Sequence, residues 1–229
     1  MGMFIAIEGG DGSGKGTQSE LLAEYAKTQL KKNVLKISFP RYDQPSGYYA
    51  GKYLDGAYGS VDEVPADLAS LTYAIDRHAA KNDIQTCLDG PDGLVIADRY
   101  VASNLAHQGT KFDNDADRHA YYDRMLLTEY QTLGIPRPDI NIVLIMPTDL
   151  AQANVDKKDT RSYTDKKRDI HEADPNHLEK AKANYEELCR LYPDEFVAIQ
   201  CVDDSGKMRS VDDIQHEIQK IAFSSKRLS

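Results

Sequence analysis

The sequence has few cysteines, no long apolar run and no excess of basic residues. Its three cysteines, Cys87, Cys189 and Cys201, are spaced too widely and unevenly for a disulfide framework or a zinc site, so free thiols or small buried side chains are expected. No apolar run approaches the roughly 20 residues of a membrane span, and the N-terminus carries no signal core. These absences predict a soluble, cytoplasmic protein without a membrane partner.

The formal net charge is −9, with acidic and basic residues mixed along most of the chain. This balance does not favour a nucleic acid or an anionic membrane as a partner, so any binding of phosphate must be local. The chain shows no internal repeat, low-complexity segment or interdomain linker. Its 229 residues fit one α/β domain over 1–229 with room for a small insertion.

The clearest motif is a glycine-rich turn that follows the apolar run 4–7 and precedes an amphipathic run from 14 to about 30. This strand–loop–helix context is the one that a phosphate loop requires. Glycines let backbone N–H groups turn toward phosphate oxygens at the positive end of the following helix. The residues predicted to bind a nucleoside triphosphate are Gly10, Asp11, Gly12, Ser13, Gly14, Lys15, Gly16 and Thr17.

Lys15 provides a mobile positive charge for the β- and γ-phosphates. The usual pattern places Ser or Thr directly after this lysine as a Mg²⁺ ligand, whereas Gly16 stands there and the hydroxyl comes one place later, at Thr17. The loop is therefore not expected to ligate the metal directly. The alternative is a glycine-rich turn that joins a strand to a helix and binds nothing.

Buried strands are predicted at five apolar runs, namely 4–7, 34–39, 94–97, 140–146 and 196–202. Between and after them, helical patterns lie at 14–30, around 65–85, 115–133, 176–191 and 211–222. This alternation predicts an α/β fold in which helices flank an open, three-layer, mostly parallel five-stranded sheet. In such a fold the ligand lies beyond the carboxyl ends of the strands.

Charged residues stand where two of these strands end. Arg41 is either a bidentate phosphate ligand or a solvated arginine. Asp98 is placed to organise Mg²⁺, directly or through water, although it could also cap the next helix. Arg99 would then lie over anionic oxygens. Asn104 and His107 follow within two turns, and each also fits an ordinary polar helix position.

A helix is predicted from Pro65 to about Lys81. Its apolar stripe, expected to face the core, consists of Val64, Leu68, Leu71 and Ile75. Tyr73 and Arg77 fall on the opposite face, four residues apart. They could stack on and hydrogen-bond to a nucleobase, or be an exposed polar pair.

The stretch from about 155 to 173 is predicted to be a mobile basic lid. Six cations, Arg161 and Arg168 among them, lie between 156 and 168, and interleaved aspartates leave a solvated surface as the alternative. A closing lid would exclude water and bring a cation onto the transferring phosphoryl group.

In this order, the motifs resemble those of the thymidylate kinases. The matching segments are 8–18, 39–41, 73–77, 98–104, 136–139 and the basic lid, which together cover nearly the whole chain. The resemblance implies a P-loop nucleoside monophosphate kinase that transfers the γ-phosphate of ATP to dTMP with Mg²⁺. It also implies a homodimer, and an acceptor-binding helical segment at about 41–85.

The resemblance also assigns roles to the acceptor-site residues. Arg41 and Arg99 match contacts to the acceptor phosphate, and Asp11 matches an acidic loop residue near the sugar 3′-hydroxyl. Tyr73 takes the place of an aromatic residue, usually Phe, that stacks on thymine. The remaining matches are Arg77 and Asn104 for the base edge, and His107 where some relatives have a tyrosine thought to disfavour a ribose 2′-hydroxyl.

On the ATP side, Lys15 matches the family's lysine that holds the phosphates of ATP. Asp98 matches the carboxylate that is associated with magnesium and phosphoryl transfer. Some relatives carry a catalytic arginine directly after the acidic loop residue, where this chain has Gly12. The catalytic cation is therefore expected from the lid, with Arg161 as first choice and Arg168 as second.

Two alternative functions stay open. One is a kinase for another pyrimidine (deoxy)nucleotide, such as dUMP or dCMP, or for a deoxynucleoside. The other is a non-catalytic nucleotide-binding switch. The pair of Arg41 and Arg99 favours an acceptor that already carries a phosphate, and the presence of Asp98 and Arg99 favours catalysis over a switch.

Overall fold

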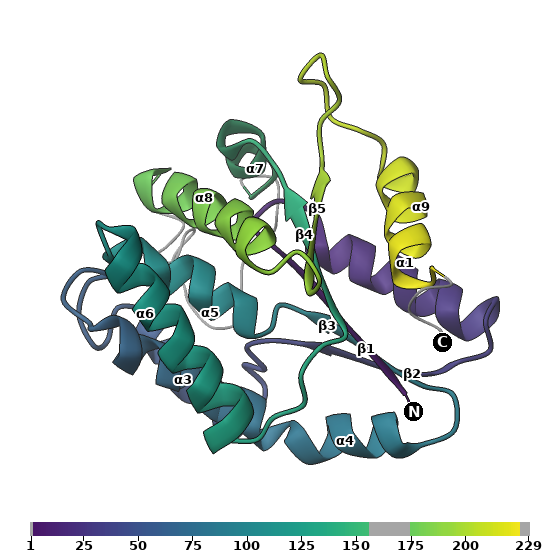
Figure 1. Cartoon of the computed structure of the whole chain (residues 1–229), viewed down its shortest axis with the longest axis horizontal. Helices are drawn as coiled ribbons and strands as arrows, with labels where there is room; N and C mark the ends of the chain where they lie inside the picture. The colour runs from purple at the N-terminus through teal and green to yellow at the C-terminus, as the bar shows by residue number, and fades with distance from the viewer. Residues whose placement is uncertain (1, 156–174, 225–229) are drawn as a thin grey trace.

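The computed structural model of the protein describes residues 2–155 and 175–224 (Figure 1). The predicted lid, with Arg161 and Arg168, lies outside the described residues apart from Val155 at its start.

Five strands form one sheet, and every neighbouring pair in it is parallel. In chain order they are β1 (Met3–Gly9), β2 (Asn33–Ser38), β3 (Gly93–Asp98), β4 (Ile140–Ile145) and β5 (Phe196–Gln200). Their spatial order is β2-β3-β1-β4-β5, which places β1 at the centre. The predicted five-stranded parallel sheet is confirmed.

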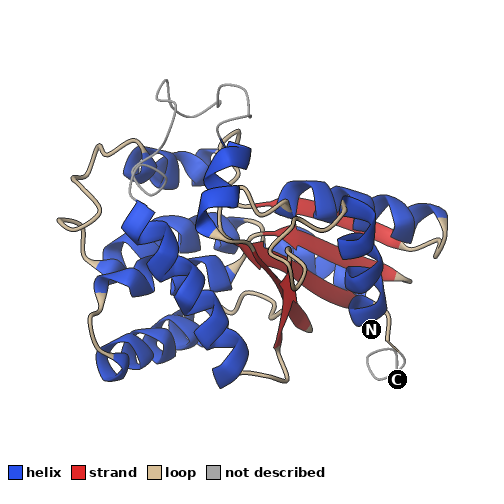
Figure 2. Cartoon of the chain, turned by 90° about the horizontal axis from the view of Figure 1, so that it is seen from above, coloured by secondary structure: helices blue, strands red, loops and turns tan. Residues whose placement is uncertain are grey.

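Helices cover both faces of the sheet (Figure 2). The longer helices are α1 (Lys15–Thr28), α3 (Ala66–Ala79), α4 (Lys81–Asp89), α6 (Asp115–Leu126), α8 (Pro175–Leu191) and α9 (Val211–Ala222). Shorter ones are α2 (Tyr48–Leu54), α5 (Val101–Gln108), α7 (Thr148–Val155), the 3₁₀ turns η1 (Pro45–Gly47) and η2 (Gly109–Lys111), and the π-helix η3 (Leu127–Thr132). In Figure 1, α1 and α9 lie on one side of the sheet and α3, α5, α6 and α8 on the other.

The central strand shows why its sequence is a continuous apolar run. Ile5 and Ile7 join the core under α1 and α9, whereas Phe4 and Ala6 join the core under α5 and α8. All four are essentially inaccessible to solvent. A strand buried on both faces cannot alternate apolar with polar residues, which is the pattern expected of a parallel sheet between helical layers.

The predicted orientation of the helix after Pro65 is wrong. Leu68, Leu71 and Ile75 are 58%, 40% and 45% exposed, although Val64 is buried as expected. The opposite face packs against the body of the protein through small residues and the fully buried Arg77. A buried arginine needs a partner distant in sequence, and hydrophobic periodicity does not reveal such a partner.

Two helices also differ from the prediction. The expected helix at 65–85 is two helices, α3 and α4, which meet at Ala80. Helix α7 follows β4 and was not expected. None of the helices among residues 2–155 and 175–224 is long and apolar enough to cross a membrane.

Candidate active site

The phosphate loop lies at the carboxyl end of β1, and Lys15 is the first residue of α1. The lysine side chain is buried, and its Nζ donates a hydrogen bond of 2.7 Å to the carbonyl of Gly10. Ser13 is also buried, yet its hydroxyl has no hydrogen-bond partner within the described part of the chain. A buried hydroxyl without a hydrogen-bond partner costs folding free energy unless a ligand pairs with it. Ser13 Oγ is therefore a candidate hydrogen-bond donor to a phosphate oxygen.

Gly12 brings the loop into direct contact with α7. Its φ is +80°, and a Cβ at this position would lie 2.0 Å from the carbonyl oxygen of Ala151. Asn154, on the next turn of α7, donates a 3.0 Å hydrogen bond to the Gly12 carbonyl. No side chain fits at position 12 in this arrangement, so the glycine found there permits the close contact with α7.

Gly16 lies against Asp98, which ends β3. A Cβ at position 16 would lie 3.3 Å from Asp98 Oδ2. The predicted magnesium carboxylate is therefore adjacent to the start of α1, at the position where related loops carry a hydroxyl. Thr17 is exposed.

Arg99 follows Asp98 in a left-handed backbone conformation, with φ +67°. Its guanidinium forms an ion pair with Asp11 and donates from Nη1 to the Gly9 carbonyl at 3.2 Å and to Ser103 Oγ at 3.1 Å. Burial alone would lower the pKa of Arg99, but Asp11 and other nearby acidic groups hold it well above its ordinary value. Burial would likewise raise the pKa of Asp11, yet Arg99 and Lys15 hold that carboxyl well below its usual range.

Glu8 forms hydrogen bonds to residues that follow Arg99, and the sequence analysis assigned it no role. Its carboxylate accepts hydrogen bonds from the Tyr100 N–H and the Ser103 hydroxyl, each at 2.7 Å, and from the Tyr185 hydroxyl at 3.3 Å. Burial raises the pKa of Glu8. A charged residue directly after the apolar run 4–7, still within β1, was the signal that could have identified it, since a buried charged residue needs buried partners.

Arg41 lies just beyond β2 and is fixed by the fully buried Asp76 of α3. The Asp76 carboxylate accepts from the Arg41 backbone N–H at 2.6 Å and from its Nε at 3.0 Å. Ser46 donates to the same carboxylate at 2.6 Å. Arg41 is thus held in a fixed position by Asp76 rather than being a freely solvated arginine.

Arg77 and Asn104, the predicted base-edge residues, meet at Glu129 in the π-helix η3. Arg77 Nε donates to Glu129 Oε2 at 3.0 Å and its Nη2 pairs with Oε1, while Asn104 Nδ2 donates to Oε1 at 3.2 Å. Arg77 and Glu129 are 2% and 0% exposed. Burial would lower the pKa of Arg77, but Glu129 raises it above its ordinary value. Sequence reasoning did not find Glu129, which lies 52 residues from Arg77.

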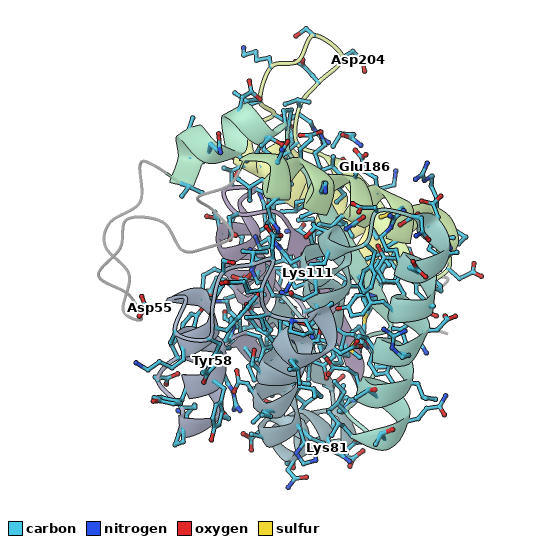
Figure 3. All side chains as sticks on the ribbon, turned by 90° about the vertical axis from the view of Figure 1, so that its left-hand side faces the viewer. Asp55, Tyr58, Lys81, Lys111, Glu186 and Asp204 are labelled. Carbon is cyan, nitrogen blue, oxygen red and sulfur yellow. The ribbon has the colours of Figure 1, made fainter. Side chains whose placement is uncertain are left out.

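Tyr73, the predicted stacking residue, is half-buried, and its ring meets that of Tyr53 edge to face with centroids 6.1 Å apart. Lys111 donates to Tyr53 Oη at 3.3 Å and to the Val64 carbonyl at 2.5 Å. Figure 3 shows Lys111 near the middle of the molecule, with Asp55 and Tyr58 to its left. These contacts attach the α2–α3 segment to the rest of the domain.

His107 is buried beside Arg99, with its Nε2 3.5 Å from Arg99 Nη1. A small pocket beside the phosphate loop is lined by Gly10, Asp11, His107 and Tyr185 among others. Asp11, Arg99 and His107, three of the residues assigned from sequence, are therefore brought together, with Lys15 close by. Arg77 and Asn104 form a second group through Glu129.

A family model described as thymidylate kinase matches residues 7–210 of this chain. The chain belongs to the thymidylate kinase family. A thymidylate kinase from Mycobacterium tuberculosis is 35% identical over 190 residues, which span 81% of this chain and 85% of that protein. A putative thymidylate kinase from Aeropyrum pernix is 28% identical over 231 residues, spanning 97% and 96% of the two chains.

Among solved structures, this thymidylate kinase family member is similar in fold to a thymidylate kinase from Candida albicans. The TM-score is 0.70 at 22% sequence identity, and the match covers 100% of this chain and 94% of the other. The sheet order and the position of the phosphate loop described above are thus those of a P-loop nucleoside monophosphate kinase.

Proposed function

We propose that this chain transfers the γ-phosphoryl group of ATP to dTMP, giving dTDP, with the residues assigned below. Membership of the thymidylate kinase family supports the reaction, with ATP and dTMP as nucleotide substrates and a divalent metal accompanying ATP. The observation that carries the residue assignment is the ion pair between Asp11 and Arg99. This ion pair joins the phosphate loop, which is proposed to bind ATP, to the residue that is predicted to bind the acceptor phosphate. The two proposed substrate sites are therefore adjacent.

On the donor side, the phosphate loop and the start of α1 would hold the triphosphate. Backbone N–H groups at a helix N-terminus favour anions, and Lys15 adds a full positive charge. The unpartnered Ser13 hydroxyl provides one more donor. Lys15 would leave the Gly10 carbonyl for the β- and γ-phosphates, because a charged phosphate oxygen is the stronger acceptor.

We propose Mg²⁺ as the metal, with Asp98 as its protein-side carboxylate, directly or through water. Residues 2–155 and 175–224 contain no cluster of three or more potential metal-ligating side chains. That fits Mg²⁺, which is usually bound by one or two carboxylates together with substrate phosphates and water. When bound with ATP, the metal neutralises charge on the phosphates.

On the acceptor side, Arg41 and Arg99 would bind the phosphate of dTMP. Both guanidiniums are partly buried and held by carboxylates, so they are oriented before the nucleotide arrives. Planar guanidinium groups suit phosphate because they donate two parallel hydrogen bonds. With dTMP held against the donor phosphate, positioning and electrostatic stabilisation would provide most of the rate enhancement.

The α2–α3 part of the proposed acceptor segment 41–85 would bind the base. Tyr73 offers a ring for stacking, and Arg77, held by Glu129, offers N–H donors at the base edge. The two N–H groups of the Asn104 amide are taken by the Ser70 carbonyl and Glu129, so Asn104 would present its Oδ1 as an acceptor. His107 and Asp11 lie together near the Arg99 guanidinium and are assigned to the sugar. We also infer a cytoplasmic site of action, consistent with the three free thiols.

The first test is release of ADP with ATP, Mg²⁺ and single acceptors: dTMP, dUMP, dCMP, AMP, UMP and thymidine, each beside a control without acceptor. Preference for dTMP supports the proposal. Preference for another monophosphate keeps the mechanism but overturns the base-site assignment. ATP binding without turnover on any acceptor would favour the nucleotide-binding switch.

Matched variants then test the site residues. Lys15→Ala and Arg99→Ala are each expected to lower kcat/KM by roughly 10²–10³, the usual effect of losing one charge-stabilising donor. Lys27→Ala on the exposed side of α1 and Arg190→Ala on α8 are the controls, and both should retain near wild-type turnover. Unchanged turnover in both site variants would refute the assignment.

We further propose a homodimer, as the family resemblance implies, with α3 in the interface. The exposed side chains of Leu68, Leu71 and Ile75 lie on one stripe of α3. A two-fold interface is self-complementary, and such a stripe can cover its own copy. Leu71→Glu should shift the mass measured by light scattering to that of a monomer. The control is Leu191→Glu at the end of α8, where the leucine is about as exposed as Leu71, and this variant should keep the mass of a dimer.

A further inference from the structure

A chain of hydrogen bonds extends from Arg99 into the interior through two buried histidines. His107 Nδ1 lies 3.2 Å from His177 Nε2, and His177 Nδ1 lies 3.2 Å from Thr110 Oγ1. The two rings are 8% and 3% exposed. At the other end, His107 Nε2 lies 3.5 Å from Arg99 Nη1, as a third and longer contact of that nitrogen beside the Gly9 carbonyl and Ser103 Oγ.

The direction of these bonds follows from Thr110. Its hydroxyl donates its single proton to the His107 carbonyl at 2.8 Å, so toward His177 it can only accept. His177 must then carry a proton on Nδ1, and in the neutral ring this leaves Nε2 as an acceptor. Neutral His107 therefore donates from Nδ1, and its Nε2 presents a lone pair to Arg99.

We infer that His177 and Thr110 are positioning residues for the acceptor site: they fix His107 in the neutral Nδ1–H tautomer, whose Nε2 helps to orient the Arg99 guanidinium. This inference rests on the proposed role of Arg99 in binding the acceptor phosphate. An Nε2–H tautomer would place a donor against a donor at Arg99. Protonation of either ring would also place two donors against each other, at the contact between the two histidines or at the contact between His107 and Arg99.

The surroundings favour the neutral form. Arg99 and Lys15 face His107 from the end of β3 and the start of α1, and Asp11 is the opposing charge in the loop. The Tyr185 ring of α8 meets the His107 ring at 88°, with centroids 6.1 Å apart. Burial lowers the pKa of His107 well below its ordinary value, and the positive charge of Arg99 lowers it further.

The first test is direct. Long-range proton–nitrogen NMR correlations of histidine-labelled protein distinguish the two neutral tautomers from the cation, and His107→Gln and His177→Gln assign the signals. Nδ1–H tautomers for both rings at neutral pH are expected. An Nε2–H tautomer or a cation at either ring would overturn the inference. This readout does not depend on phosphoryl transfer.

The second test is kinetic. In His177→Gln, the amide oxygen can replace Nε2 as the acceptor from His107, so KM for dTMP should stay within about twofold of wild type. In His177→Leu that acceptor is lost, and KM for dTMP should rise about fivefold to tenfold with less than a twofold change in kcat. Thr110→Val should also raise KM for dTMP, and it replaces His177→Leu as the test if that variant does not fold.

These outcomes separate the inference from the proposed function. A wild-type enzyme that phosphorylates dTMP, together with an unchanged KM in folded His177→Leu and Thr110→Val, overturns the positioning role alone. A wild-type protein without dTMP kinase activity overturns the function, and the NMR signals still decide the tautomers. Equal loss of kcat in the leucine and glutamine variants would indicate a structural role only and also overturn the inference.

Discussion

Substitution of Glu129 by glutamine should destabilise the protein strongly, because Arg77 would be left as a buried and uncompensated charge. Glu129 accepts from Arg77 Nε at 3.0 Å and from Asn104 Nδ2 at 3.2 Å, and both members of the ion pair are almost fully buried. Removing one partner of a buried ion pair costs about 3–5 kcal/mol. Glutamine keeps one acceptor oxygen, so a loss near 3 kcal/mol is expected, about 6–12 °C in Tm for a domain of this size.

Thermal unfolding followed by circular dichroism measures this change. Glu24→Gln is the matched control, because it makes the same chemical change at an exposed position of α1, and it should alter stability by less than about 0.5 kcal/mol. A Tm for Glu129→Gln within 1–2 °C of the control, roughly 0.5 kcal/mol, would refute the assignment of a buried ion pair.

A double variant separates stability from binding. Arg77→Met combined with Glu129→Leu replaces the pair by apolar side chains of similar size, which is often neutral or stabilising. The double variant should therefore be more stable than Glu129→Gln. Its KM for dTMP should nevertheless be raised, because the proposed base-edge donor at position 77 is gone. Wild-type KM in a stable double variant would contradict the base-site assignment.

Three further predictions concern the neighbouring contacts. Asp76→Asn should cost about 2 kcal/mol and raise KM for dTMP more than it lowers kcat, because Arg41 loses its charged partner; urea unfolding and initial rates measure both, and an unchanged KM would contradict it. Gly12→Ala should lower kcat and destabilise by about 2 kcal/mol, since its Cβ would overlap the Ala151 carbonyl at φ +80°; wild-type stability would argue against this packing of α7. Because the pKa of His107 lies well below 6.5 in the folded state, the unfolded chain binds the extra proton first on acidification. The free energy of unfolding should therefore fall by about 1.4 kcal/mol in total between pH 7.5 and 5.5, with a slope that steepens below about pH 6.5, and His107→Gln should lose this dependence in urea titrations over that range.

The sheet and the phosphate loop could be predicted because their signals are local. Runs such as 140–146 are long enough to identify a buried strand, and the loop glycines stand at fixed spacings between a strand and a helix. The placement of charged residues after the predicted strands also follows from topology, since parallel strands end at one edge. These inferences require no knowledge of which helix packs on which.

The orientation of α3 and the partners of its charged residues could not be predicted in this way. An apolar stripe such as Leu68, Leu71 and Ile75 is indistinguishable in sequence from a core-facing one. The opposite face is buried because Asp76 pairs with Arg41, and Arg77 with Glu129, over separations of 35 and 52 residues. Long-range electrostatic pairs of this kind leave no periodic signature.

The phosphate loop has three carbonyl groups that are each bound by a donor from a different part of the fold. Arg99 binds the carbonyl of Gly9, Lys15 that of Gly10 and Asn154 that of Gly12. These contacts hold the loop in a defined shape without any nucleotide. Much of the entropic cost of ordering a flexible loop is therefore met during folding, and nucleotide binding should be correspondingly less opposed by entropy.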